Sequence, residues 1–160
     1  MGQLSLAMAR PFISAVEETL GTMTLVKVRH VAVKAIAEVG VESDVSVVAG
    51  LAGQTRGCCV LRMPTVMALR VVKGLLVSEE GDEITQQQMH DGVCDLMQLI
   101  LDHAQRVHGD SVHDFSVSLP LVIEGRKYGY SVASGGDTAV MEFETEDGLA
   151  MSFVLCVANR

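Results

Sequence analysis

The segment that decides the fold is residues 85–109, TQQQMHDGVCDLMQLILDHAQRVHG. Thr85 and Gln88 stand three positions apart in a Thr-x-x-Gln pattern, which is a capping box and marks a helix start. Gly109 is typical of the residue just beyond a helix end. Between these limits, apolar residues recur at intervals of three and four and so share one helix face. They are Met89, Val93, Leu96, Leu99, Ile100 and Val107. The segment therefore predicts a long helix with one buried face.

A second set of residues in this segment is polar and also follows helical spacing. Its members share another face of the helix, and they are Asp91, Asp95, Gln98, Asp102 and Gln105. Asp95 and Gln98 are neighbours on that face, one turn apart. Such a stripe is most often a solvated surface, so the spacing alone does not assign a function.

Shorter helices and several strands are predicted on either side of the long helix. Pro11 suits the first position of a helix that extends to residue 22, and Pro64 predicts the start of another that ends near Leu76. Runs of apolar, β-branched or alternating residues predict the strands. They lie at residues 24–34, 44–52, 58–63, 115–123, 138–144 and 149–157.

Turn and proline signals organise these strands into hairpins. Pro120 inside the strand at 115–123 indicates an edge or a bulge, and Asp147-Gly148 predicts a two-residue turn between the last two strands. Because the strands do not alternate strictly with helices, we expect an α+β fold. Residues 1–160 should form a single two-layer domain, with a mixed or antiparallel sheet covered by helices that include the long one.

Composition excludes several classes of partner. The chain has 12 Lys and Arg against 20 Asp and Glu, and aromatic residues make up only 4%. Nucleic-acid binding needs a basic surface or stacking aromatics, so it is not expected. A membrane span needs about 20 largely apolar residues, and no stretch of that length is found. The first twelve residues also lack the pattern of a signal peptide.

The cysteines and histidines do not predict a metal site. Cys58, Cys59, Cys94 and Cys156 show no Cys-x-x-Cys spacing, so free thiols in a reducing cytoplasm are the simplest explanation. Cys58 and Cys59 are adjacent on a predicted strand and should point to opposite faces of the sheet. His90 and Cys94 share a helix face, but two ligands do not complete a zinc site.

Five segments can be compared with known families. They are RPFISAVEETLGTM (10–23), DVSVVAGLAGQTRGCCVLRMP (44–64), TVMALRVVKGLLVSEE (65–80), DGVCDLMQLILDHAQ (91–105) and DFSVSLPLVIEGR (114–126). In this order and spacing they resemble the CheX/CheC family of chemotaxis phosphatases, and the CheX type most closely. The resemblance runs over nearly the whole chain and implies a CheC-like fold.

The resemblance also implies a site on the long helix. The active helix of that family carries a Glu-x-x-Asn pair on its exposed face. By position, the acid falls on Asp95 and the amide on Gln98, and each keeps the chemical class of the family residue. Cys94 and Asp102 stand where the family has glycine, and Gln105 stands where it has lysine.

The activity implied is hydrolysis of the aspartyl phosphate of a CheY-type response regulator in two-component signalling. Asp95 would pair with a lysine of the regulator and Gln98 would orient the attacking water. The chain would need no cofactor of its own, since the regulator supplies Mg²⁺. Glu17 and Glu18 of the first helix have no amide three positions later, so one site per chain is expected.

A second reading of the same resemblance stays open. The departures at Cys94 and Asp102 favour a catalytically degenerate module that only binds a response regulator, as the related flagellar switch proteins do, or acts as a scaffold. Under either reading the resemblance implies a cytoplasmic homodimer.

Overall fold

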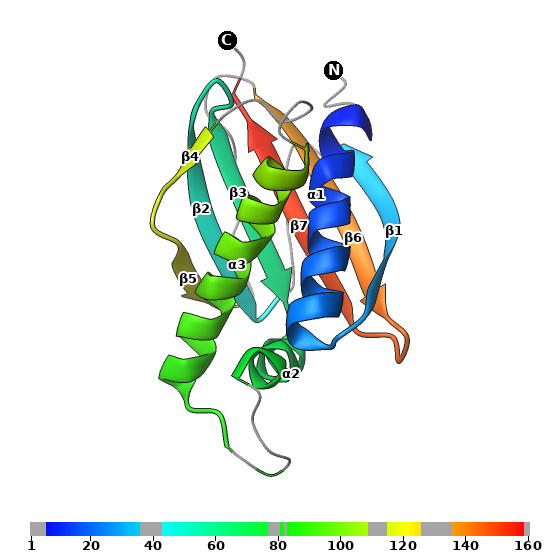
Figure 1. The fold of residues 1–160 in the computed structure, drawn as a ribbon, viewed down its shortest axis with the longest axis vertical. Coiled ribbons are helices and arrows are strands. Elements are labelled where there is room, and N and C mark those ends of the chain that lie inside the picture. Colours follow the sequence, from blue (N-terminus) through cyan, green and yellow to red (C-terminus); the bar gives the residue numbers. More distant parts are fainter. Residues whose placement is uncertain are drawn as a thin grey trace.

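A single antiparallel sheet organises the computed structural model, which describes residues 6–35, 43–76, 81, 83–108, 115–125 and 136–158. Its strands are β1 (Val28–Ala35), β2 (Val45–Gly53), β3 (Gly57–Met63), β4 (Phe115–Val117), β5 (Leu121–Glu124), β6 (Asp137–Thr145) and β7 (Ala150–Val157). The strand order is β1-β6-β7-β3-β2-β4, and β5 also pairs with β2 (Figure 1). Each of these strand pairs is antiparallel.

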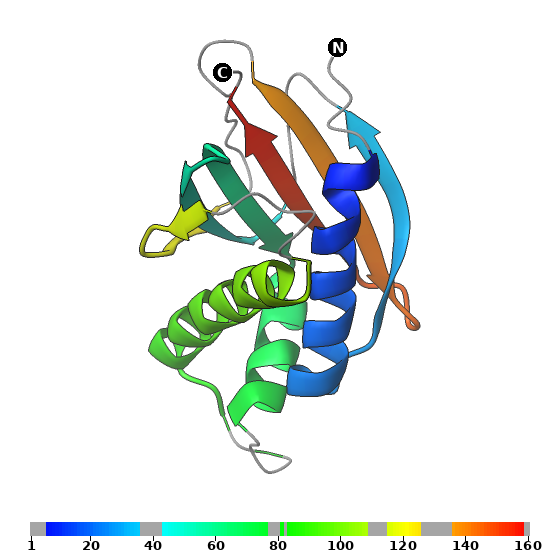
Figure 2. The ribbon, with the colours of Figure 1, turned by 45° about the horizontal axis from the view of Figure 1, so that its top comes forward.

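Two of the helices lie side by side over one face of this sheet, and a shorter one lies at the end of the sheet against the others (Figures 1 and 2). The helices are α1 (Leu6–Thr19), its π-helical continuation η1 (Leu20–Thr24), the shorter α2 (Thr65–Leu76) and the long α3 (Gln86–His108). The α+β class and the two-layer arrangement are thereby confirmed, and the sheet is antiparallel rather than mixed.

The main core fills the space between the helices and the sheet. The ring of Phe12 on α1 stacks on Phe153 of β7 at 5.6 Å and on Phe115 of β4 at 6.4 Å between centroids. Cys59 belongs to this core, whereas Cys58 packs against a smaller apolar cluster that includes Val60. Because side chains alternate along β3, the two cysteines point to opposite faces of the sheet, as predicted.

The first helix differs from the prediction at both ends. It begins at Leu6 rather than at Pro11, so the proline lies inside α1. Pro11 lacks a backbone N–H and leaves the carbonyl of residue 7 without its helical donor, but only about one turn of helix precedes it. The proline is therefore tolerated near the start of α1. At the other end, the segment after Thr19 continues as the π-helical η1.

The two turn signals had different outcomes. The predicted strand at 115–123 divides at Pro120 into β4 and β5, which both pair with β2, so the prediction of an irregular edge is confirmed.

The final hairpin is wider than the predicted two-residue turn. Thr145 N–H donates to Leu149 O at 2.8 Å, which leaves three residues in the loop, with Gly148 at φ +90°. This is the hairpin in which a left-handed glycine closes the turn.

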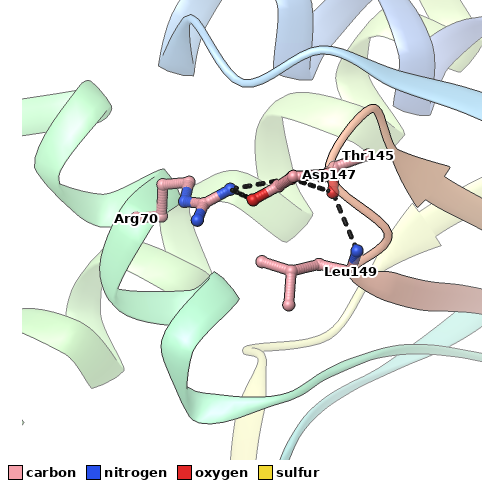
Figure 3. Close-up of polar contacts among 4 residues, drawn as sticks. All are labelled: Arg70, Thr145, Asp147 and Leu149. Carbon is pink, nitrogen blue, oxygen red and sulfur yellow. Dashed lines mark hydrogen bonds and ion pairs between the residues drawn. The ribbon is translucent and has the colours of Figure 1, made fainter.

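The same hairpin holds α2 through a polar cluster (Figure 3). Arg70 Nη1 on α2 donates to the carboxylate oxygens of Asp147 at 3.1 and 3.2 Å. The Thr145 hydroxyl donates to Asp147 at 2.6 Å and accepts from Leu149 N–H at 2.9 Å. The Thr145 hydroxyl and, next, the Arg70 guanidinium lower the pKa of Asp147.

A glycine brings α2 against the end of the first helix. A Cβ added at Gly74 would lie 1.9 Å from the backbone oxygen of Thr24, so no other residue fits without moving α2 or η1. The position of the last turn of α2, which holds Leu75 and Leu76, depends on this close approach.

We expect Gly74→Ala to lower the free energy of unfolding by about 1–3 kcal/mol or more, because the new methyl group meets backbone rather than a movable side chain. The matched control is Gly21→Ala in η1, where nothing lies within 4 Å of the added Cβ. That variant should be unchanged or up to about 1 kcal/mol more stable. Urea denaturation of both variants measures the difference, and equal stability of the two would contradict the packing described.

Asp147→Asn should lower stability at neutral pH but not in acid. The folded carboxyl has the lower pKa, so its contribution is complete above the ordinary value of 3.8 and is lost as the pH falls through the folded pKa. Denaturation at a series of pH values should therefore show a gap between wild type and variant that closes below pH 3.8. Glu146→Gln, at the next exposed acid in the turn, serves as the control.

Candidate functional site

The start of α3 is fixed by local hydrogen bonds. Thr85 N–H donates to Gln88 Oε1 at 2.9 Å, and Gln88 N–H donates to Thr85 Oγ1 at 3.1 Å. This reciprocal pair is the predicted capping box, and it satisfies two donors that a helix start would otherwise leave unpaired. The helix begins at Gln86, as the sequence pattern predicts.

Contacts with the sheet edge hold one side of α3. Gln86 Nε2 donates to Glu124 of β5 at 2.9 Å, and His90 Nε2 lies 3.1 Å from the same carboxylate. The nearby His90 imidazole and, after it, the hydrogen bond from Gln86 lower the pKa of Glu124. Near the other end, Gln105 Nε2 donates to the backbone oxygen of Phe115 at 2.6 Å.

Contacts with the other helices hold the opposite side. His103 Nε2 lies 2.7 Å from Glu18 Oε2, so this contact joins α3 to α1. Gly92 packs closely against α2, where an added Cβ would lie 2.6 Å from Val72 Cγ2. With α3 held on both sides, its exposed face has a fixed direction.

The exposed face of α3 carries the residues that the sequence singled out. Asp91, Asp95, Gln98 and Asp102 are all exposed, and together they form what we call the polar ridge. Within the described part of the chain, the side chains of Asp95 and Gln98 make no hydrogen bond or ion pair, whereas Asp91 accepts from Gln87 at 2.8 Å. Gln105 does not belong to the ridge, because its amide is bound to β4.

The ridge borders a groove of about 480 Å³ between α3 and the end of α2. The polar side chains that line it, all from α3, are Gln88, Asp91, Asp95, Gln98 and Asp102. The apolar side chains that line it are Leu75 and Leu76 of α2 and Leu99 of α3. The acid and the amide therefore open onto one concave surface, with room in front of them.

The thiol beside the ridge does not provide a nucleophile. Burial, and then the carboxylates of Asp95 and Asp91, raise the pKa of Cys94, so the thiol form is favoured at neutral pH. Its sulfur lies 3.9 Å from the backbone oxygen of Pro120. What the groove offers chemically is a set of carboxylates and carboxamides that can bind cations and orient water.

Sequence reasoning missed the apolar wall of the groove. Leu75 and Leu76 are consecutive at the end of a helix, and their relation to α3 follows only from the crossing of the two helices at Gly92. The glycine itself, inside an otherwise regular helical pattern, was the available signal of a close approach.

No group of three His, Cys, Asp or Glu side chains with a metal-binding arrangement occurs among the described residues. His90 and Cys94, the sequence candidates, contact Glu124 and Pro120 instead. None of the described helices is long and apolar enough to cross a membrane.

Solved structures of chemotaxis proteins are similar to this chain over most of its length. A chemotaxis protein CheX from Desulfovibrio desulfuricans has 23% identity and a TM-score of 0.77, covering 93% of this chain and 98% of that chain. A CheC-like superfamily protein from Shewanella sp. PV-4 has 20% identity and a TM-score of 0.81, covering 97% and 99%. The CheX–CheY–BeF3–Mg²⁺ complex from Borrelia burgdorferi has 22% identity and a TM-score of 0.73, covering 94% and 97%.

These likenesses establish the fold, and no curated protein matches the sequence. The family model described as chemotaxis phosphatase CheX matches residues 45–144. The matched region contains α2, the groove and the whole of α3. Since the match covers more than half of the 160 residues, this protein belongs to the CheX family of chemotaxis phosphatases.

Proposed function

We propose that this protein hydrolyses the aspartyl phosphate of a CheY-type response regulator, using Asp95 and Gln98. Family membership supports the reaction class, and one similar structure is a complex of CheX with CheY. The observation that carries the assignment of residues is the placement, one turn apart, of an acid and an amide whose side chains have no polar partner among the described residues. Both are exposed on a helix held from both sides, and both open onto the same groove.

Gln98 is proposed to orient the attacking water. A carboxamide accepts one hydrogen bond through its oxygen and donates through its nitrogen, so it can hold a water molecule without ionising. Holding that water in line with the scissile bond replaces a random encounter by a near-attack geometry. The water oxygen bonds to phosphorus, the bond from phosphorus to the aspartyl oxygen breaks, the aspartate leaves as a carboxylate, and both water protons leave with the inorganic phosphate.

Asp95 is proposed to anchor the regulator. Its carboxylate is exposed and can form a charge-assisted hydrogen bond with a lysine beside the phosphorylated aspartate. The charge on the phosphoryl oxygens is neutralised by groups of the regulator, its lysine and bound Mg²⁺. This chain would therefore contribute position and orientation.

The pair is the family's Glu-x-x-Asn with one methylene moved from the acid to the amide. The acid reaches less far from the helix and the amide reaches farther. A small tilt of α3 against the regulator restores both contacts, and the open groove in front of the helix leaves space for it.

Gln98→Ala should lower the rate of phosphate release by roughly 10²-fold, the scale for loss of one preorganised polar group. Affinity for a beryllofluoride-activated regulator should persist, because the amide acts on the water. Gln54→Ala is the control, since Gln54 is an exposed glutamine in the turn between β2 and β3 and does not line the groove. If wild-type protein does not accelerate phosphate release over spontaneous decay, the enzymatic proposal fails.

Asp95→Asn should weaken binding of the activated regulator and reduce the dependence of that binding on salt. The substitution keeps the shape of the side chain but removes the charge, and screening acts on charge pairs. Titrations at low and high ionic strength measure both effects. Glu146→Gln, at an exposed acid of the β6–β7 hairpin that does not line the groove, should bind like wild type, and an unchanged affinity of Asp95→Asn would remove the anchoring role.

One observation favours the binding-only alternative. The Asp102 carboxylate lines the groove one turn beyond Gln98, at a position where the family has glycine, and adds negative charge close to where a phosphoryl group would enter. A binding-only module would hold the activated regulator without changing its rate of dephosphorylation. The homodimer and the cytoplasmic location stay predictions.

A further inference from the structure

An apolar wall lines the groove beside the polar ridge, made by Leu75 and Leu76 of α2 and Leu99 of α3. Leu76, on the last turn of α2, is 48% exposed, and Leu75 and Leu99 beside it are half-buried. A single exposed leucine is ordinary on a protein surface. These three differ from a scattered residue because they line one concave surface together with Asp95 and Gln98.

The wall is held in place before any partner binds. The close approach at Gly74 fixes the end of α2 against Thr24, and the close approach at Gly92 fixes α2 against α3. The ion pair from Arg70 to Asp147 holds the outer side of the same helix. A preorganised apolar surface loses little conformational freedom on binding, which raises the affinity that a given contact area provides.

The chemistry of the two sides indicates what the groove accepts. Its rim on α3 carries the carboxylates of Asp91, Asp95 and Asp102, and no lysine or arginine is among the described residues that line it. A matching surface must therefore present an apolar side chain to α2 and a basic side chain to α3. A response regulator whose phosphorylated site lies at Gln98 has a lysine that pairs with its phosphoryl group. That lysine would lie next to the carboxylates of α3.

We propose that the wall of Leu75, Leu76 and Leu99 is the docking surface for the response regulator, and that it sets affinity whereas Gln98 sets the rate of hydrolysis. The regulator would insert an apolar side chain that lies next to a basic residue beside its phosphorylated loop. This inference rests on the proposed function, because the regulator is taken to be the protein that meets Gln98.

The test compares Leu76→Ser with a variant of matched exposure on the same helix. Val66 is 52% exposed, lies on the first turn of α2 and does not line the groove, so Val66→Ser is the control. Leu76→Met preserves an apolar contact of similar size. Circular dichroism and the thermal midpoint check that all three variants fold, which is expected because both positions are half exposed.

Two measurements separate docking from chemistry. Affinity is measured by titration with the beryllofluoride-activated regulator, and kcat and KM are measured from phosphate release. Leu76→Ser should weaken binding about tenfold or more, the scale for burial of a leucine side chain, with a corresponding rise in KM and little change in kcat. Leu76→Met and Val66→Ser should stay within about twofold of wild type, since neither removes a buried apolar contact.

The outcomes distinguish this inference from the proposed function. If wild type dephosphorylates the regulator and Leu76→Ser binds as well as Val66→Ser, the docking surface is overturned and the proposed function stands. If the regulator binds in a Leu76-dependent way without hydrolysis, the docking surface is supported and the enzymatic proposal fails. If wild type binds no activated regulator, both are overturned.

Discussion

The arrangement of the site depends on how closely α2 can pack against its two neighbours. At Gly92 a methyl group would meet the Val72 side chain at 2.6 Å, and at Gly74 it would meet the Thr24 backbone at 1.9 Å. These two approaches place the end of α2 beside the exposed face of α3. Without them α2 would stand farther away, and Leu75 and Leu76 would be displaced from Asp95 and Gln98. The chemistry proposed for α3 thus depends on glycines that take no part in it.

The sequence predicted those features that local interactions determine. The capping box at Thr85 and Gln88 involves residues three positions apart, so its geometry in the structure follows from the pattern alone. The exposure of Asp95 and Gln98 follows in the same way from helical periodicity and the apolar stripe. Such features need no knowledge of the rest of the chain.

The features that the sequence did not predict depend on distant segments. Gln105 has the periodicity of the polar ridge, but the backbone oxygen of Phe115 binds its amide, and no local pattern shows that β4 passes there. Pro11 was expected to start a helix, yet its effect depends on how many turns precede it. The wall at Leu75 and Leu76 becomes a site only through the crossing of α2 and α3.

The electrostatics of the groove restrict what can be hydrolysed there. Gln98 lies on a ridge with Asp91, Asp95 and Asp102, so a small phosphorylated anion would be repelled from the amide that should act on it. A phosphoryl group can approach only if its own carrier neutralises it, and a response regulator does so with a cation and a lysine. The acidic ridge disfavours hydrolysis of small phosphorylated molecules. It therefore favours selectivity for an acyl phosphate that is carried by a protein. Asp102 would then contribute to substrate selectivity. Its carboxylate repels a free phosphorylated anion, and it attracts the basic surface of a regulator whose phosphoryl group is already neutralised.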